Sequence, residues 1–259
     1  MTPEPGTRFL RREVWLGWAS LVALLVGWQA LALWRASRFL PTPLTVAEHM
    51  IWLAREGHLY EDFAVTLARA AVGFVAAMVI GSIIGVALGR SRIADGLFLN
   101  WVLVGMNLPA IVIAILCFIW LGLNDTALIL AVVLNKTPIV ITNIRQGVRN
   151  LDPAFDEFAR AFRLGRPRAL WLIQLPQLVP YILVSARTGL SLVWKMVLVF
   201  EVLGADSGVG FRVSLFFQFF GIQGILAYTV VFVAIVMLLE HLGIGPIERR
   251  LLAWRADPS

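Results

Sequence analysis

Six apolar stretches, each long enough to cross a lipid bilayer as a helix, dominate this sequence. Because about 20 apolar residues cross a hydrocarbon core about 30 Å thick, and a helix pairs its own backbone groups in lipid, each stretch predicts one membrane span. The stretches lie at about 14–34, 64–89, 98–121, 126–145, 177–203 and 223–243. The chain is 59% hydrophobic and 15% charged, a composition that a water-soluble domain could not bury. We therefore expect an all-α, polytopic membrane protein with six transmembrane helices.

The distribution of arginines predicts the orientation of the chain in the membrane. Basic residues concentrate in cytoplasmic segments, and placing both termini in the cytoplasm puts most arginines inside. The inner group is Arg8, Arg11, Arg12, Arg90, Arg92, Arg145, Arg149, Arg160, Arg163, Arg166, Arg168, Arg249, Arg250 and Arg255, and the outer group is Arg35, Arg38, Arg55 and Arg212. The first apolar stretch follows arginines and lacks a small-residue cleavage pattern, so it is predicted to be a retained signal anchor.

Composition and spacing exclude several other classes of function. The net charge is +6, but basic residues form no continuous stripe with interleaved aromatics, so no nucleic acid is expected. The single cysteine, Cys117, excludes an intrachain disulfide. His49 and His58 have no third ligand at a suitable spacing, so no metal site is expected. The sequence has no Gly-rich phosphate loop, so the chain itself should bind no nucleotide.

A charged, partly amphipathic segment separates the fourth and fifth apolar stretches. Asp152 followed by Pro153 is a helix-start signal, because aspartate caps free amides and proline tolerates the first helical position. An apolar stripe at helical spacing follows, formed by Phe155, Phe158, Ala159 and Phe162. Gly165 permits a sharp turn, and Pro167 can begin a second helix. The sequence therefore predicts a cytoplasmic two-helix loop at about 150–176 with one apolar face.

Periodicity alone leaves two interpretations of this apolar face open. The stripe could pack into a groove of a partner protein. The hairpin could instead lie against its own helices and the lipid headgroups, an arrangement that its arginines would favour.

The same segment resembles the EAA loop of bacterial ATP-binding-cassette importer permeases. Glu157 and Ala159 are followed by Leu175 and Pro176, and the proline stands nineteen positions after the glutamate. The resemblance implies that the loop docks into a groove of a separate cytoplasmic ATPase and carries nucleotide-driven motion into the membrane. The coupling residues that it indicates are Glu157, Phe158, Ala159, Phe162, Arg163, Gly165, Leu175 and Pro176.

The resemblance extends from Leu40 to Trp254 and is to the branch of permeases that imports nitrate, sulfonates and taurine. The matching residues are Leu40, Pro41, Pro43, Leu44, Thr66, Leu67, Arg69, Gly73, Phe74, Glu201, Gly208, Gly210, Glu248, Arg249, Arg250, Leu251, Leu252 and Trp254. The chain departs from the family pattern at Arg163, where glycine is usual and Gly165 comes two residues later. It departs again at 106–109, where an arginine-proline pattern is usual.

This resemblance also implies an assembly and a location. It predicts a single permease domain over residues 1–259, with its core at about 60–250, acting as a homodimer in the bacterial cytoplasmic membrane. Two copies of the ATPase would bind ATP and magnesium, so this chain should hold no cofactor and catalyse no reaction. An external binding protein would deliver the solute. The expected function is a pathway for a small anionic solute such as nitrate, a sulfonate or taurine.

Small residues recur at every fourth position of the second apolar stretch. They are Gly73, Ala77, Gly81, Gly85 and Gly89. This spacing places them on one face of a helix, and such a face lets a neighbouring backbone approach closely in lipid. The stripe therefore predicts a packing surface, either within one chain or between the two copies of a dimer.

Lys136 and Lys195 are the only lysines, and both fall within apolar stretches. A charge at such a depth costs about 2.5–3.5 kcal/mol on insertion scales and marks a functional candidate. Two cations facing one cavity would suit an anionic solute. We therefore predict a translocation pathway that includes Asn135, Lys136, Lys195 and Glu201, although Lys195 could instead point outward or pair with Glu201.

Two other functions would also suit a polytopic membrane protein. An ion-gradient-driven secondary transporter could use Glu240, Lys136 and Lys195 to carry protons, but such folds usually contain internal repeats, which this sequence lacks. An intramembrane enzyme would need a nucleophile and a base at a suitable spacing, and none stands out. Copurification of an ATPase would distinguish the importer from both.

Overall fold

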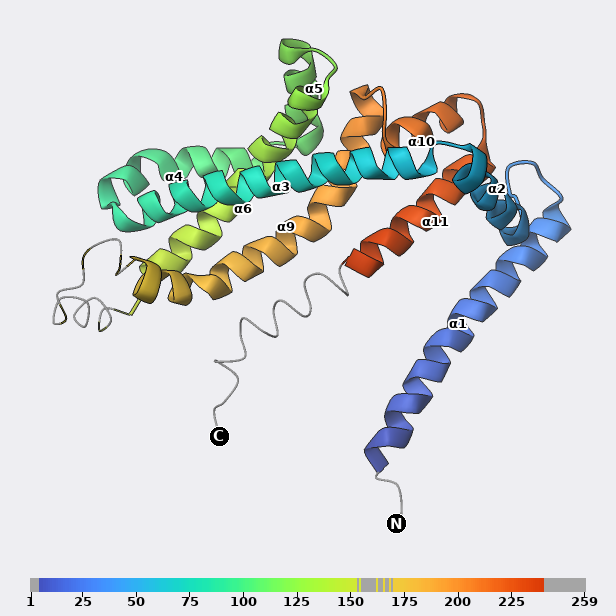
Figure 1. Cartoon of the computed structure of the whole chain (residues 1–259), viewed down its shortest axis with the longest axis horizontal. Helices are drawn as coiled ribbons and strands as arrows, with labels where there is room; N and C mark the ends of the chain where they lie inside the picture. Colours follow the sequence, from blue (N-terminus) through green and yellow to red (C-terminus); the bar gives the residue numbers. More distant parts are fainter. Residues whose placement is uncertain are drawn as a thin grey trace. The chain divides into compact units, whose positions relative to one another are not determined.

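The protein is built from helices in a computed structural model (Figure 1). The structure describes residues 5–152, 154, 162, 165, 168 and 170–239, and all regular structure within these ranges is helical. The helices are α1 (Pro5–Arg35), α2 (Pro43–Glu56), α3 (Leu59–Arg90), α4 (Arg92–Asn107), α5 (Ala110–Leu121), α6 (Asp125–Arg149), the π-helical turn η1 (Leu170–Gln174), α9 (Leu175–Gly204), α10 (Val209–Gln218) and α11 (Ile222–Leu239). The prediction of an all-α fold is confirmed.

Five helices of the described chain are long and apolar enough to cross a membrane. Their spans are Trp15–Arg35, Leu59–Arg90, Asp125–Arg149, Leu172–Gly204 and Ile222–Leu239. A sixth span is obtained when α4 and α5 are counted together, although their axes differ by 97°. The structure therefore agrees with a protein of five to six spans.

The apolar stretch at 98–121 is not the single straight helix that the sequence predicts. α4 ends at Asn107, and Leu108 has an extended conformation with φ −70° and ψ 128°. Pro109 explains the break, because a proline pushes the preceding residue out of the helical region. α5 then begins at Ala110. The predicted length and hydrophobicity of the stretch are confirmed, but the prediction of one continuous helix is wrong because of Pro109.

Capping side chains set the starts of three helices. Thr42, Ser91 and Asn124 precede α2, α4 and α6, and each side-chain oxygen accepts a hydrogen bond from the backbone nitrogen three residues later. Such caps satisfy amides that have no partner within the helix. In α2, Pro43 also stands at the first helical turn, where its missing N–H is tolerated.

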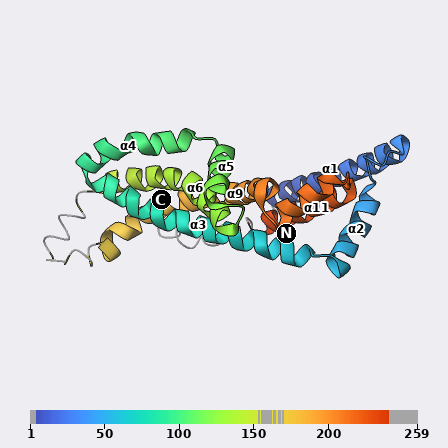
Figure 2. The same ribbon diagram turned by 90° about the horizontal axis from the view of Figure 1, so that it is seen from above.

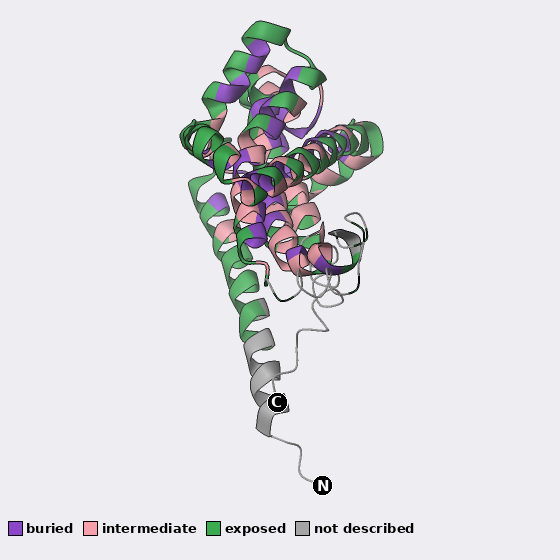
Figure 3. Ribbon diagram, turned by 90° about the vertical axis from the view of Figure 1, so that its left-hand side faces the viewer, coloured by how far each residue is buried: buried purple, intermediate pink, exposed green. Residues whose placement is uncertain are grey.

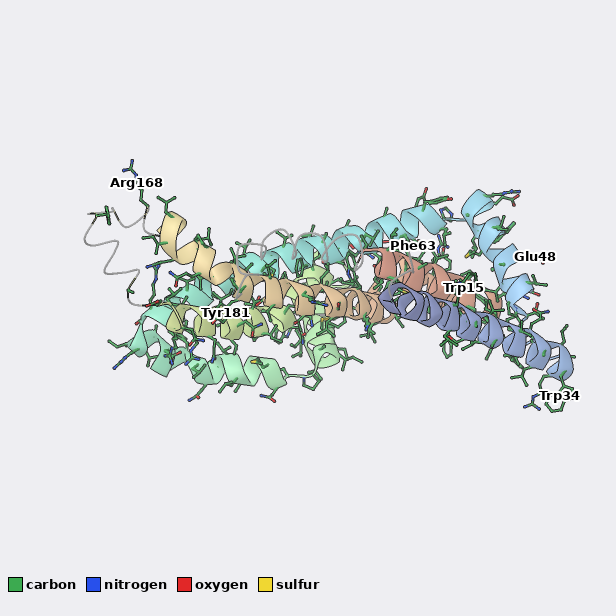
Figure 4. The ribbon with its side chains drawn as sticks, turned by 90° about the horizontal axis from the view of Figure 1, so that it is seen from below. Trp15, Trp34, Glu48, Phe63, Arg168 and Tyr181 are labelled. Carbon is green, nitrogen blue, oxygen red and sulfur yellow. The ribbon has the colours of Figure 1, made fainter. Side chains whose placement is uncertain are left out.

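The described residues form two compact units. Unit 1 contains the described residues within Met1–Leu59 and Val213–Val231. Unit 2 contains those within Tyr60–Arg212 and Phe232–Ser259. In unit 1, α1 leaves most of its described side chains exposed (Figure 3). Trp15 and Trp34 lie at the two ends of the candidate span Trp15–Arg35 and are 73% and 80% exposed (Figure 4). Tryptophans at both ends of an apolar helix suit the two interfaces of a bilayer.

Unit 2 is organised around α6. Figure 2 shows α6 running between α3 and α4, and α6 also contacts α5 and α9. Its apolar window is 56% buried, against 28% for each of the windows in α3 and α9. The main hydrophobic core includes Leu128 and Val132 of α6, Cys117 of α5 and Val197 of α9. Helix α6 is therefore the central element against which the other helices of unit 2 pack.

The small-residue stripe of α3 packs against α6 within the same chain. A side chain added at any of four glycines would come within 2.6–2.8 Å of a β-branched side chain on α6. The pairs are Gly73 with Val132, Gly81 with Val140, Gly85 with Ile144 and Gly89 with Val148. Each glycine faces the residue 59 positions later, so the two helices run in the same direction. Of the two interpretations left open by the sequence, the structure supports packing within one chain.

Candidate functional site

A buried ionic cluster joins α3, α6 and α9 in unit 2. The Arg69 side chain is 3% exposed, and its Nη1 donates to Oε1 of Glu201 at 2.8 Å and to the carbonyl oxygen of Ser207 at 2.7 Å. Its Nε donates to Oδ1 of Asp125 at 2.9 Å, and its Nη2 donates to Oγ of Ser207 at 2.8 Å. We call Thr66, Arg69, Asp125, Glu201 and Ser207 the Arg69 cluster.

Within this cluster, Glu201 also holds the start of α10. Its carboxylate accepts hydrogen bonds from the backbone nitrogen of Gly210 at 2.9 Å and from Oγ1 of Thr66 at 2.9 and 2.8 Å. Thr66 Oγ1 in turn accepts from the nitrogen of Val209 at 2.9 Å. The first amides of a helix lack partners within the helix and attract negative charge. Gly208 has φ +98°, and a side chain there would collide with the Glu201 carboxylate.

A second ionic cluster joins α4 to α6. Asp95 on α4 accepts hydrogen bonds from Arg145, including one from Nη2 at 2.9 Å, and from Nη2 of Arg149. The two arginines share one carboxylate, so this group of three residues retains one positive charge. We call Asp95, Arg145 and Arg149 the Asp95 cluster.

The two ends of the predicted coupling loop are joined by hydrogen bonds. Asn150 Nδ2 donates to the hydroxyl of Tyr181 at 3.1 Å, and the backbone nitrogen of Asp152 donates to Oε1 of Gln177 at 3.3 Å. Arg90 at the end of α3 donates to the side chain of Gln174 in η1. The end of α6, the start of α9 and the end of α3 therefore meet at the base of the loop. Figure 4 shows Tyr181 on α9 and Arg168 beyond its start.

Four of the eight predicted coupling residues lie outside the described residues. These are Glu157, Phe158, Ala159 and Arg163. Phe162 is described and is 65% exposed, and Gly165 is also exposed. Leu175 and Pro176 begin α9, directly after the π-helical turn. Leu175 and Pro176 therefore lie within the candidate span Leu172–Gly204. The assignment of the eight residues to coupling stays a prediction.

The predicted pathway residues do not form one group. Lys136 is 7% exposed, and the register of α3 and α6 places it at the level of Ala77. Asn143, seven positions after Lys136 and so on the same face of α6, donates to Ser185 of α9 at 3.0 Å. Lys136 therefore lies on the side of α6 that packs against α3 and α9. Asn135 beside it is half-buried.

The suggested pairing of Lys195 with Glu201 is wrong. Glu201 is 1% exposed and gives its carboxylate to Arg69, Thr66 and Gly210. Lys195 is exposed, and six positions cover about one and two-thirds helical turns, so the two side chains leave α9 on different faces. Whether either residue lines a pathway stays a prediction.

Sequence reasoning missed the central role of Arg69. The residue was noted only as one of several family-like positions, and Asp125 and Ser207 were not singled out. Asp95 was missed as well. One signal was present for Arg69, because an arginine within an apolar stretch needs partners. The partners of Arg69 and Asp95 lie on other helices, and spacing along the chain does not identify them.

The spans and the broken α4–α5 pair describe a helical membrane protein, and its fold is similar to that of ABC transporter chains. A chain of the inward-facing methionine transporter MetNI has a similar fold, with a TM-score of 0.63 and 19% identity, covering 79% of this chain and 98% of that chain. A chain of an amino acid ABC transporter crystallised with histidines has a TM-score of 0.61 and 18% identity, covering 74% and 93%.

The sequence identifies the family. Residues 77–244 match the binding-protein-dependent transport system inner membrane component. The chain belongs to this family, and the protein is the membrane-spanning permease of a binding-protein-dependent importer.

Relatives named for their substrates match three-quarters of the chain or nearly all of it. The taurine transport system permease protein TauC of Escherichia coli is 29% identical over 255 residues, which cover 96% of this chain and 92% of TauC. SsuC of Bacillus subtilis, named for transport of aliphatic sulfonates, is 28% identical over 256 residues, covering 97% and 91%. The bicarbonate transport system permease protein CmpB of Synechococcus elongatus is 27% identical over 209 residues, covering 74% and 73%.

Proposed function

We propose that this permease imports a small organic sulfonate of the taurine type. The observation that carries the proposal is that TauC and SsuC of Bacillus subtilis, named for taurine and for aliphatic sulfonates, match 96% and 97% of the chain. The relative named for bicarbonate matches 74%. All three named substrates occur as small ions with a negatively charged group, so an anionic group is the chemistry that they share.

The working assembly that we propose contains two copies of this chain. Two cytoplasmic ATPase subunits would bind ATP and magnesium, and an external binding protein would deliver the solute. The chain would lie in the bacterial cytoplasmic membrane with both termini and the loop at about 150–176 in the cytoplasm. The arginine distribution supports this orientation. In it, the Arg69 cluster lies towards the outer face and the Asp95 cluster towards the cytoplasm.

The proposed mechanism is alternating access driven from the loop. Closure of the ATPase pair would move the loop, and the loop base would pass this motion to the spans. The hydrogen bonds that join Asn150 to Tyr181 and Arg90 to Gln174 support this role, because they tie α6, α9 and α3 together at one place. The spans would then open outward and accept the solute, and ATP hydrolysis would restore the inward-open state.

The test is transport by reconstituted vesicles that contain the permease, its ATPase and its binding protein. We expect uptake of radiolabelled taurine that requires ATP and is inhibited by excess alkanesulfonate but not by excess bicarbonate. Inhibition by bicarbonate alone would overturn the proposed substrate class. Uptake that needs an ion gradient and no ATPase would instead show a secondary transporter.

A further inference from the structure

A deep apolar groove lies between α3, α4, α5 and α6 in unit 2. Its volume is about 950 Å³, and its lining includes Ile83 and Ala87 of α3, Phe98 and Trp101 of α4, and Trp120 of α5. Thr137 is the only lining residue with a hydroxyl group, and this buried hydroxyl has no hydrogen-bond partner among the described residues. A groove of this composition at membrane depth suits a hydrocarbon chain.

The groove lining extends along α4 to Ala94, the residue next to Asp95. Leu88, Val102 and Ile141 pack together and line the groove. Asp95 precedes Val102 by seven positions and Arg145 follows Ile141 by four, spacings that keep each pair on one face of its helix. The apolar lining residues and the ionic side chains therefore lie on the same face of α4 and on the same face of α6.

The Asp95 cluster carries a net positive charge that can attract an anion to this end of the groove. Its two arginines share one carboxylate, which leaves one positive charge uncompensated within the group. The Arg149 side chain is 41% exposed, whereas that of Arg145 is 12% exposed. Arg149 is thus the member that an outside ligand can reach, and a guanidinium binds phosphate oxygens well.

We propose that this groove is a binding site for an anionic phospholipid, with one acyl chain along the apolar lining and the phosphate at Arg149. The acyl chain of such a lipid matches the apolar lining of the groove, and its phosphate matches the net positive charge of the Asp95 cluster. Basic pockets at the ends of membrane helices favour anionic headgroups in this way. In the proposed orientation, the lipid comes from the cytoplasmic leaflet, and no other feature of the site depends on that orientation.

The test measures lipid directly and does not depend on transport. The full-length permease is stripped of lipid in detergent and exposed to equal amounts of phosphatidylglycerol and phosphatidylcholine with the same acyl chains. Bound lipid is then counted by native mass spectrometry. We expect phosphatidylglycerol to be retained in excess, and Arg149→Gln to lower its retention about fivefold, the effect of losing one basic residue near an anionic headgroup. Arg55→Gln on α2 is the matched control and should leave the ratio unchanged.

A second variant tests the acyl part of the site separately. Ala87→Phe fills the groove and should reduce the binding of both lipids, whereas Val75→Phe adds the same ring at an exposed position of α3 outside the lining and should not. Equal retention of the two lipids, or no effect of Ala87→Phe, would overturn the proposal. Efficient disulfide formation between two copies through Trp101→Cys would show that a second chain covers the groove instead.

Discussion

Arg69 and Glu201 stand 132 positions apart in the sequence and form an ion pair of 2.8 Å inside unit 2. Their side chains are 3% and 0% exposed. The remaining N–H groups of Arg69 are directed to Asp125 and Ser207, while Glu201 also accepts from the first turn of α10. A single buried arginine therefore links helices that the sequence separates widely.

We predict that Arg69→Ala destabilises the permease strongly. Removing one partner of a buried ion pair leaves the other charge uncompensated, which costs about 3–5 kcal/mol. The measurement is the thermal unfolding midpoint in detergent. Asp206→Ala is the control, because that side chain is 92% exposed and lies 3.8 Å from Arg69. If both variants melt at the wild-type temperature, the cluster contributes nothing to stability.

We predict that Gly85→Leu reduces the yield of folded single chains. A side chain at this position would meet Ile144 Cβ at 2.8 Å and the carbonyl oxygen of Ile141 at 2.9 Å, and overpacking of this kind costs about 1–3 kcal/mol. Gly96→Leu is the control, since nothing lies within 4 Å of that position. The readout is the monodisperse fraction in detergent. Equal fractions for both variants would contradict packing of α3 against α6.

We predict that Lys136→Met slows uptake of the anionic solute while the ATPase stays bound. A hydrogen bond to a charged group contributes about 1.5–3 kcal/mol, so the initial rate should fall about tenfold or more. Lys195→Met, at an exposed position of α9, tests whether any lysine in a span has this effect. Initial rates of uptake in vesicles give the comparison. An unchanged rate in Lys136→Met removes this lysine from the pathway.

We predict that Glu157→Lys uncouples the permease from its ATPase. A carboxylate early in the docking helix would stabilise free amide ends and accept a charged hydrogen bond, and a cation there costs about 2–5 kcal/mol if the interface excludes water. The variant should reach the membrane at near-normal levels but lose ATPase binding or solute-stimulated hydrolysis. Pull-down and hydrolysis assays measure this, with Glu56→Lys on α2 as control. Retention of binding, hydrolysis and uptake would show that the loop is aligned wrongly.

We predict that the loop faces the cytoplasm. A cysteine at Arg166→Cys should not react with an impermeant thiol reagent in intact cells, whereas Arg55→Cys should react. The native Cys117 is 2% exposed and should give little background. If Arg166→Cys is labelled before the cells are opened, the loop faces the outside and the predicted orientation is wrong.

The helical spans followed from the sequence because they depend on local properties. Length and hydrophobicity identify a membrane helix without reference to the rest of the chain. Spacing along one helix likewise identified the stripe that includes Gly81 and Gly85. The break before Pro109 was also encoded locally, but the hydrophobicity around it concealed the effect of the proline.

The ionic clusters did not follow from the sequence because their partners come from different helices. Periodicity cannot show that Arg69 meets Glu201 or that Asp95 meets Arg145. The alternative pairing of Glu201 with Lys195 is wrong for this reason, since the true partner, Arg69, lies on another helix. Contacts between distant segments depend on how the helices pack, and the sequence pattern describes each helix separately.

The stripe on α3 has a consequence for the alignment of α3 with α6. Both surfaces repeat every four residues, so sliding one helix past the other by about 6 Å, four residues of rise, would again place glycines opposite branched side chains such as Ile144 and Val148. Apart from Lys136, which lies at the level of Ala77, such a periodic surface holds two helices together without distinguishing one step from the next. The distinction comes from Arg69, whose bonds to Asp125 at the first residue of α6 would be broken by a single step.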